Sequence, residues 1–134
     1  MKRKSCNLLL TCLLLHVNVL TINAQFTDDF SDGDFTSSPA WSGDNSLFVV
    51  DANQLRSNSP GAAVYYLSTP STIASDAQWE FSIDFQLSTS GANYADVYLM
   101  SDNADLNLTS NGYYIKIGGT PDEISLYKVV SGTR

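Results

Sequence analysis

The sequence predicts an all-β fold, an antiparallel β-sandwich, on three observations. Residues 79–87 alternate strictly between apolar and polar side chains, which is typical of a strand with one buried and one solvated face. About seven short apolar runs are separated by turn-forming residues, the spacing of a sandwich. No segment repeats its apolar residues with the 3.6-residue period of a helix. We therefore expect residues 79–87 to form the central core strand.

Residues 1–24 predict a secretory signal peptide. Basic residues at 2–4 precede a short apolar run centred on 8–15, and a small residue, Ala24, stands at the expected cleavage point, as in exported proteins. A membrane anchor is the alternative, but polar residues interrupt the run, and it falls short of the roughly 20 apolar residues that span a bilayer. Lipidation at Cys12 is a minor alternative. The chain is therefore expected to be secreted or held at the cell surface.

The remaining residues, 25–134, are expected to form one β-sandwich domain. Its first part, 25–44, is predicted to be a strand or arm that directs four aromatic residues into the core: Phe26, Phe30, Phe35 and Trp41. Strands are then predicted, in chain order, at 47–50, 54–56, 62–68, 79–87, 93–101, 113–117 and 123–130. Turns are predicted where Gly, Pro, Asn and Asp gather, at Asp51-Ala52-Asn53, Pro60-Gly61, Asn111-Gly112 and 118–122.

Alternation within these strands assigns side chains to faces. In the strand at 93–101 one face holds Ala95, Val97 and Leu99, and the other holds Tyr94, Asp96, Tyr98 and Met100. In the last strand, Ile124 and Leu126 are expected to point inward. The chain ends at 131–134, directly after that strand, with residues typical of a turn. We therefore expect the domain to be truncated at its C-terminus.

Removal of the predicted signal peptide excludes several kinds of chemistry. Cys6, Cys12 and His16 all lie within it, so the remaining 110 residues contain no cysteine and no histidine. That part of the chain can form no disulfide, no thiol nucleophile, no His-dependent catalytic triad and no His/Cys zinc site.

The net charge limits the classes of partner that the exported chain is expected to bind. After residue 24 the chain has fourteen acidic side chains and four basic ones, a net charge of −10. Nucleic-acid binding is disfavoured, because it needs a cationic footprint that displaces counterions. Binding to an anionic membrane surface is disfavoured for the same reason, and no membrane insertion is expected once the signal peptide is removed.

Six segments resemble the concanavalin A-like, laminin-G-like jelly-roll domains of secreted bacterial surface proteins. They are DDFSDGDF (28–35), PAWSGD (39–44), YLSTPS (66–71), WEFSIDF (79–85), VYLMSDNADL (97–106) and NGYYIKIGG (111–119). The resemblance covers nearly all of 26–130 and implies a jelly-roll sandwich in a larger surface protein, whose further domains would be its partners. Lectins, glucanases and plain adhesive modules share this fold, so the resemblance does not choose among activities.

The first candidate site is a calcium site at residues 28–34. Carboxylates in a turn suit a hard cation that takes oxygen ligands, and four of them surround Gly33: Asp28, Asp29, Asp32 and Asp34. The spacing is not that of an EF-hand, and aspartates in turns often bind their own backbone instead. A structural calcium ion is the one cofactor predicted. A weaker acidic cluster follows at Asp102, Asn103, Asp105 and Asn107.

The second candidate is glycoside hydrolysis, which needs two carboxyl groups roughly 5–9.5 Å apart. Glu80 and Asp84 share a face of the predicted strand, but four residues at ~3.3 Å each separate them by about 13 Å. Asp96 would approach one of them only if the two strands are neighbours. The resembling glucanases carry a Glu-x-Asp-x-x-Glu run, which residues 80–84 lack. No catalytic residue is therefore predicted.

The third candidate is a sugar-binding face. Aromatic platforms with a few polar groups suit ligand sites, and five tyrosines could supply exposed rings: Tyr66, Tyr94, Tyr98, Tyr114 and Tyr127. Tyrosine also packs in sandwich cores with its hydroxyl at the rim. The predicted ligand-binding set is Asp84, Asn93, Asp96, Tyr98 and Tyr114.

Taken together, the residues and the resemblance predict a secreted, non-catalytic binding or adhesion module of a larger cell-surface protein. The resemblance implies carbohydrate, as a polysaccharide or as the glycans of a glycoprotein. A fragment of a glycoside hydrolase and a purely structural spacer are the alternatives. A hydrolase would bring two carboxylates together in a groove, a sugar-binding module would expose tyrosines on one face, and a spacer would do neither.

Overall fold

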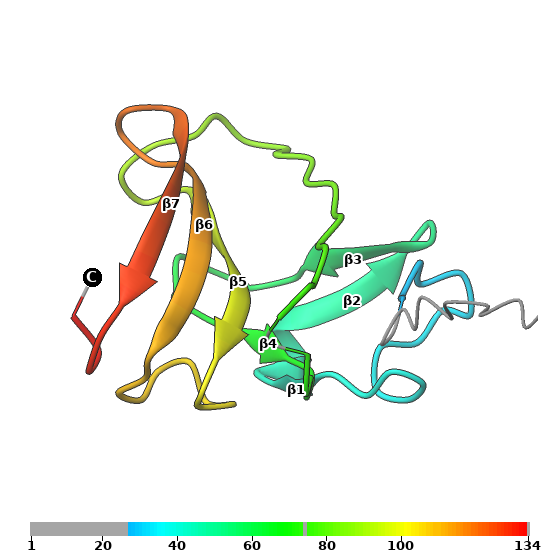
Figure 1. Ribbon diagram of the computed structural model, residues 1–134. Coiled ribbons are helices and arrows are strands. Elements are labelled where there is room, and N and C mark those ends of the chain that lie inside the picture. Colours follow the sequence, from blue (N-terminus) through cyan, green and yellow to red (C-terminus); the bar gives the residue numbers. More distant parts are fainter. Residues whose placement is uncertain (1–26, 74, 134) are drawn as a thin grey trace, which may run out of the picture.

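The computed structural model describes residues 27–73 and 75–133 (Figure 1). The predicted signal peptide, 1–24, and Phe26 lie outside this range. The described chain is all-β and antiparallel, as predicted, and contains no α-helix, only a 3-10 turn, η1 (Asn45–Leu47). Within it, no helix has the length and apolar character needed to cross a membrane. Its strands form small separate sheets, so the predicted two-layered sandwich is not seen in this range.

Two of these sheets have two strands each. In one, β1 (Ser42–Gly43) pairs with β4 (Leu67–Ser68); in the other, β2 (Phe48–Asp51) pairs with β3 (Gln54–Ser57). The predicted strands at 47–50 and 54–56 are thus confirmed, whereas only the last two residues of the predicted strand at 62–68 are in a ladder. Ala52 and Asn53 connect β2 to β3 with φ of 51° and 60°, the left-handed pair that a two-residue hairpin turn requires.

The third sheet is an antiparallel meander of β5 (Tyr94–Ser101), β6 (Gly112–Gly118) and β7 (Glu123–Val129). These strands match the predicted strands at 93–101, 113–117 and 123–130. The turn predicted at 118–122 connects β6 to β7, with Gly118 and Gly119 both at φ 85°. In β5 a register shift between Tyr98 and Met100 places Met100 opposite Tyr113. This β-bulge turns Met100 onto the face opposite to Tyr98, which corrects its predicted position.

The prediction that residues 79–87 form the central strand is wrong in the described structure. They belong to no ladder, and no backbone hydrogen bond joins their amides to another described residue. Four of the five apolar side chains are exposed, from 40% to 74%: Trp79, Phe81, Ile83 and Leu87. Alternation is a local property of the sequence, whereas a strand also needs a neighbouring edge with a matching register.

Ile124 and Leu126, which were predicted to point inward, are also exposed, at 74% and 68%. Both lie on the same face of β7, at the edge of the meander. No second sheet among the described residues covers this face, which explains their exposure. The buried apolar side chains in the described range are Phe35, Tyr114 and Val129. Of the arm's aromatics, Phe35 is thus buried as predicted, and Phe30 and Trp41 are half-buried.

Gly112 begins β6, although it was predicted to be half of a turn. A Cβ atom at this position would lie 2.2 Å from the carbonyl oxygen of Met100, on the strand opposite. Real Cβ atoms do not come this close to backbone oxygens, so any side chain here would push β5 and β6 apart. Glycine is therefore required by the close approach of two strands at the bulge.

We expect Gly112→Ala to lower the stability of the domain by about 1–3 kcal/mol, the usual cost of overpacking. Gly61→Ala is the matched control, because a Cβ at Gly61 would meet no atom within 4 Å. Thermal unfolding of the two variants would measure the difference. Equal melting temperatures would contradict the role assigned to Gly112.

Candidate functional site

Most tyrosines in the C-terminal half of the chain lie on one face of the β5–β6–β7 sheet. Antiparallel register places Tyr98 opposite Tyr114 and Tyr114 opposite Tyr127, so the three rings form a row across the sheet. In a strand every second side chain lies on the same face. The register of the three strands therefore identifies the other residues that share this face. We call it the tyrosine face: Tyr94, Asp96, Tyr98, Tyr114, Lys116, Glu123, Ser125 and Tyr127.

The three tyrosine rings stack on one another. The ring centroids of Tyr98 and Tyr114 are 5.0 Å apart at 22°, and those of Tyr114 and Tyr127 are 5.1 Å apart at 10°. The central ring is only 1% exposed, whereas its two neighbours are half-buried. Stacked pairs of this kind contribute about 0.5–1.5 kcal/mol beyond the area they bury. Tyr114 therefore organises the face, and Tyr98 and Tyr127 are the rings that a ligand could reach.

Next to the tyrosine row lies a polar row, in which Asp96 stands opposite Lys116 and Lys116 opposite Ser125. The Nζ of Lys116 is 3.7 Å from Oδ1 of Asp96, and the two side chains are 23% and 13% exposed. The same Nζ lies 3.2 Å from the centroid of the Tyr94 ring, a cation–π contact. The ammonium group of this lysine therefore lies between a carboxylate and a ring that both attract its charge.

A small pocket of about 40 Å³ opens between β6 and β7 beside this polar row. Lys116, Ser125 and Tyr127 line it together with Glu123, whose Oε1 accepts a hydrogen bond of 2.9 Å from the Oγ of Ser125. Such a volume holds only one or two water molecules. A larger ligand would therefore lie along the face, in contact with rings and polar groups, and would not be enclosed.

Three of the five predicted ligand-binding residues lie together on the tyrosine face: Asp96, Tyr98 and Tyr114. Asn93 instead holds the chain ahead of β5, because its Nδ2 donates to the carbonyl oxygens of Leu87 and Ser88 at 3.0 and 2.7 Å. Asp84 lies in the unpaired segment, where its carboxylate accepts a hydrogen bond from Gln86. The predicted set is therefore divided between two parts of the chain.

Lys116, Ser125 and Glu123 belong to the face but were not predicted. The signal was present in the sequence, since Lys116 is two residues from Tyr114, and Ser125 and Glu123 are two and four residues from Tyr127. What was missing was the register that brings them side by side. The Gly118-Gly119 turn sets that register for β6 and β7.

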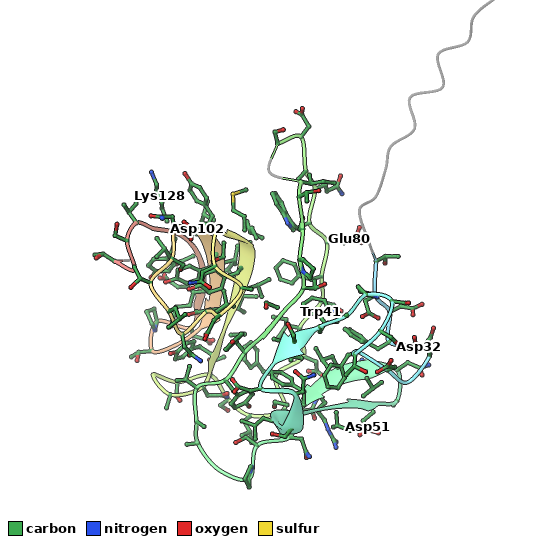
Figure 2. All side chains as sticks on the ribbon, turned by 90° about the horizontal axis from the view of Figure 1, so that it is seen from below. Asp32, Trp41, Asp51, Glu80, Asp102 and Lys128 are labelled. Carbon is green, nitrogen blue, oxygen red and sulfur yellow. The ribbon has the colours of Figure 1, made fainter. Side chains whose placement is uncertain are left out.

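The four predicted calcium ligands lie in consecutive N-terminal turns, and Figure 2 shows Asp32 on the opposite side of the molecule from Lys128. Each carboxylate accepts a hydrogen bond of 2.8–3.0 Å from the backbone N–H two residues later in the chain. Asp28 also accepts one from Nε1 of Trp41, at 2.8 Å. Among the described residues, no group of three acidic side chains converges as metal ligands would. A calcium site stays a prediction.

Hydrogen bonds lower the pKa of two of these four carboxyl groups, Asp29 and Asp34, and of Asp102 in the second cluster. At Asp34 the donors are the hydroxyl of Ser37, the backbone N–H of Thr36 and the hydroxyl of Thr36, and they hold its pKa well below the usual range. The side chain and backbone N–H of Asn111 likewise lower the pKa of Asp102. These carboxylates thus stabilise the turns in their charged form.

No protein-family model, no curated protein and no solved structure matches this chain. The similarity to concanavalin A-like domains therefore stays a prediction from the sequence.

We expect Tyr114→Ala to destabilise the domain by about 3–5 kcal/mol, the range for truncating a large buried aromatic side chain. Tyr113→Ala is the matched control, because Tyr113 directly precedes Tyr114 in β6, points to the other face and is 38% exposed. Chemical denaturation of both variants would measure the difference. Similar losses would contradict the central role of the stack.

We expect Asp34→Asn to lower the melting temperature at pH 7 and to flatten its decline in acid. A native pKa below the ordinary value stabilises the fold above about pH 4, and this contribution is lost as the pH falls through the native pKa. The measurement is the melting temperature from pH 7 to pH 2. Glu80→Gln, at an exposed side chain, controls for the loss of one charge. An unchanged acid limb in Asp34→Asn would contradict the expectation.

Proposed function

We propose that this chain is a secreted, non-catalytic binding or adhesion module whose ligand is a carbohydrate. The observation that carries the proposal is the tyrosine face, on which the half-buried rings of Tyr98 and Tyr127 flank Tyr114, beside a polar row. Ring faces pack against the apolar faces of sugars, and charged or hydroxyl groups at fixed positions bind sugar hydroxyls. The predicted signal peptide supports export to the cell surface or beyond.

The polar row supports a neutral sugar as the ligand. Lys116 has Asp96 on one side, at 3.7 Å, and lines a pocket together with Glu123. Its positive charge is thus balanced by carboxylates, and the exported chain carries a net charge of −10. An acidic polysaccharide would be repelled by this field, whereas the hydroxyls of a neutral one can both donate and accept hydrogen bonds.

The jelly-roll sandwich remains part of the proposal, as the fold of a longer domain in a multidomain surface protein. The exposed apolar face of the meander, with Ile124 and Leu126, supports it, because such a face is normally covered by a second sheet. The proposal is non-catalytic because residues 80–84 lack the Glu-x-Asp-x-x-Glu run of the resembling glucanases, and because β6, which carries Lys116, lies between the strands that carry Asp96 and Glu123. A structural spacer would carry no such row of rings.

We expect the protein to bind one or more neutral polysaccharides in affinity electrophoresis with β-glucan, xylan or mannan in the gel. Tyr127→Ala is expected to weaken that binding about tenfold or more, through the loss of ring contacts. Tyr113→Ala, on the opposite face of the same sheet, is the matched control and is expected to bind normally. Melting curves confirm that both variants are folded. Retention of full affinity by folded Tyr127→Ala would contradict the proposal.

A further inference from the structure

Residues 79–87 have the sequence of a strand and the surroundings of a loop. Figures 1 and 2 both show this segment apart from the β5–β6–β7 sheet, and Figure 2 shows Glu80 well away from it. Its exposed apolar side chains include Phe81 at 43% and Leu87 at 74%. Among the described strands, β5 pairs only with β6 and is therefore an edge strand. An unpaired strand sequence thus leads directly into a strand with an open edge.

The turn that would join the two strands is already formed. The backbone N–H of Ser90 donates to the carbonyl of Asn93 at 3.0 Å, and the N–H of Asn93 donates to the carbonyl of Ser90 at 3.1 Å. Only Gly91 and Ala92 lie between them. This reciprocal pair closes a two-residue hairpin loop, and β5 begins directly after it. The other arm of the hairpin is the chain that leads back to Leu87.

Continued without interruption, this turn would pair the segment with β5 in an unfavourable register. In a hairpin, each residue back along one strand is matched by one residue forward along the other. Starting from the pair Ser90–Asn93, residue 86 would therefore stand opposite Val97 and residue 85 opposite Tyr98. Phe85 would then lie on the tyrosine face and Gln86 on the apolar face. A shift of one residue exchanges the two faces of the whole segment.

The chain already contains the irregularity that supplies this shift. The carbonyl oxygens of two successive residues, Leu87 and Ser88, both accept hydrogen bonds from Nδ2 of Asn93. Successive carbonyls of a regular strand point in opposite directions, so the alternation is broken at this point. One extra residue here acts as a β-bulge. Beyond it Phe85 stands opposite Val97 and Leu87 opposite Ala95, on the apolar face.

We propose that residues 79–87 form a strap that closes onto the open edge of β5 as a fourth strand, with a bulge at Leu87–Ser88. In the closed form the apolar side chains of the segment extend the face that holds Ala95 and Val97. The polar side chains extend the tyrosine face, where Asp84 comes opposite Tyr98 and Gln86 opposite Asp96. The ligand role of Asp84 rests on the proposed function; the closure itself does not.

The contacts around the turn favour closure over any other path of the segment. The hydroxyl of Thr89 donates to the carboxylate of Asp122, in the turn between β6 and β7, and its methyl group lies against Gly118. The end of the segment is therefore fixed beside the meander. Pairing would satisfy backbone groups along one edge of β5 and remove exposed apolar surface from water.

Engineered disulfides in the exported protein, residues 25–134, test the closure and its register without any ligand. The exported protein has no cysteine of its own, so each pair of new cysteines reports one distance. Under mild oxidation we expect Phe85→Cys with Val97→Cys to cross-link at least tenfold faster than Phe85→Cys with Ile124→Cys, which lies across the sheet on β7. Chymotrypsin cleaves after Tyr94, between the two new cysteines, so mass spectrometry of chymotryptic peptides identifies the products.

Gln86→Cys with Val97→Cys is the register control, since these residues are opposite only without the bulge. Faster cross-linking of this control would overturn the proposed placement of Asp84. Equal rates for the Val97 and Ile124 pairs with Phe85 would overturn closure altogether. If the Phe85–Val97 variant does not fold, Leu87→Cys with Ala95→Cys reports the same register. Because no sugar takes part, failure of closure and failure of sugar binding are separate results.

Discussion

The stacked row of Tyr98, Tyr114 and Tyr127 is the interaction on which the rest of the described structure depends. It joins all three strands of the meander through side chains, and it holds the largest fully buried residue, Tyr114. The buried apolar core of the described chain is otherwise small. A stack of rings gains from dispersion and quadrupole contacts as well as from burial. The face that could bind a ligand is therefore also the face on which the three strands are joined by stacked rings.

The two faces of the meander have opposite characters, and this difference connects the fold to its proposed role. On the tyrosine face, rings and paired charges contact one another, and Lys116 is fixed between Asp96 and the ring of Tyr94. On the other face, Ile124 and Leu126 are exposed. An apolar face exposed to water is normally covered by another layer or a partner. A face of preorganised rings and polar groups is instead suited to bind a ligand.

Outside the sheets, carboxylates stabilise the turns of the chain by accepting hydrogen bonds from backbone N–H groups. The N-terminal aspartates bind backbone N–H groups two residues ahead, and Asp102 does the same for Asn111 across a loop. These groups were predicted from the sequence as candidate calcium ligands or as turn residues, and the hydrogen bonds are those of turn residues. At Asp29, Asp34 and Asp102 these hydrogen bonds lower the pKa of the carboxyl group, because they favour its charged form.

The sequence by itself determined the all-β class, most strand positions, the glycine turn at 118–119 and five members of the tyrosine face, because alternation and turn residues act over a few positions. Tertiary structure decided what depends on distant partners. It placed Lys116 and Ser125 beside Asp96, moved Met100 to the other face through the bulge, and left residues 79–87 unpaired. Alternation specifies that a segment can be a strand, but only a neighbouring edge in the correct register makes it one.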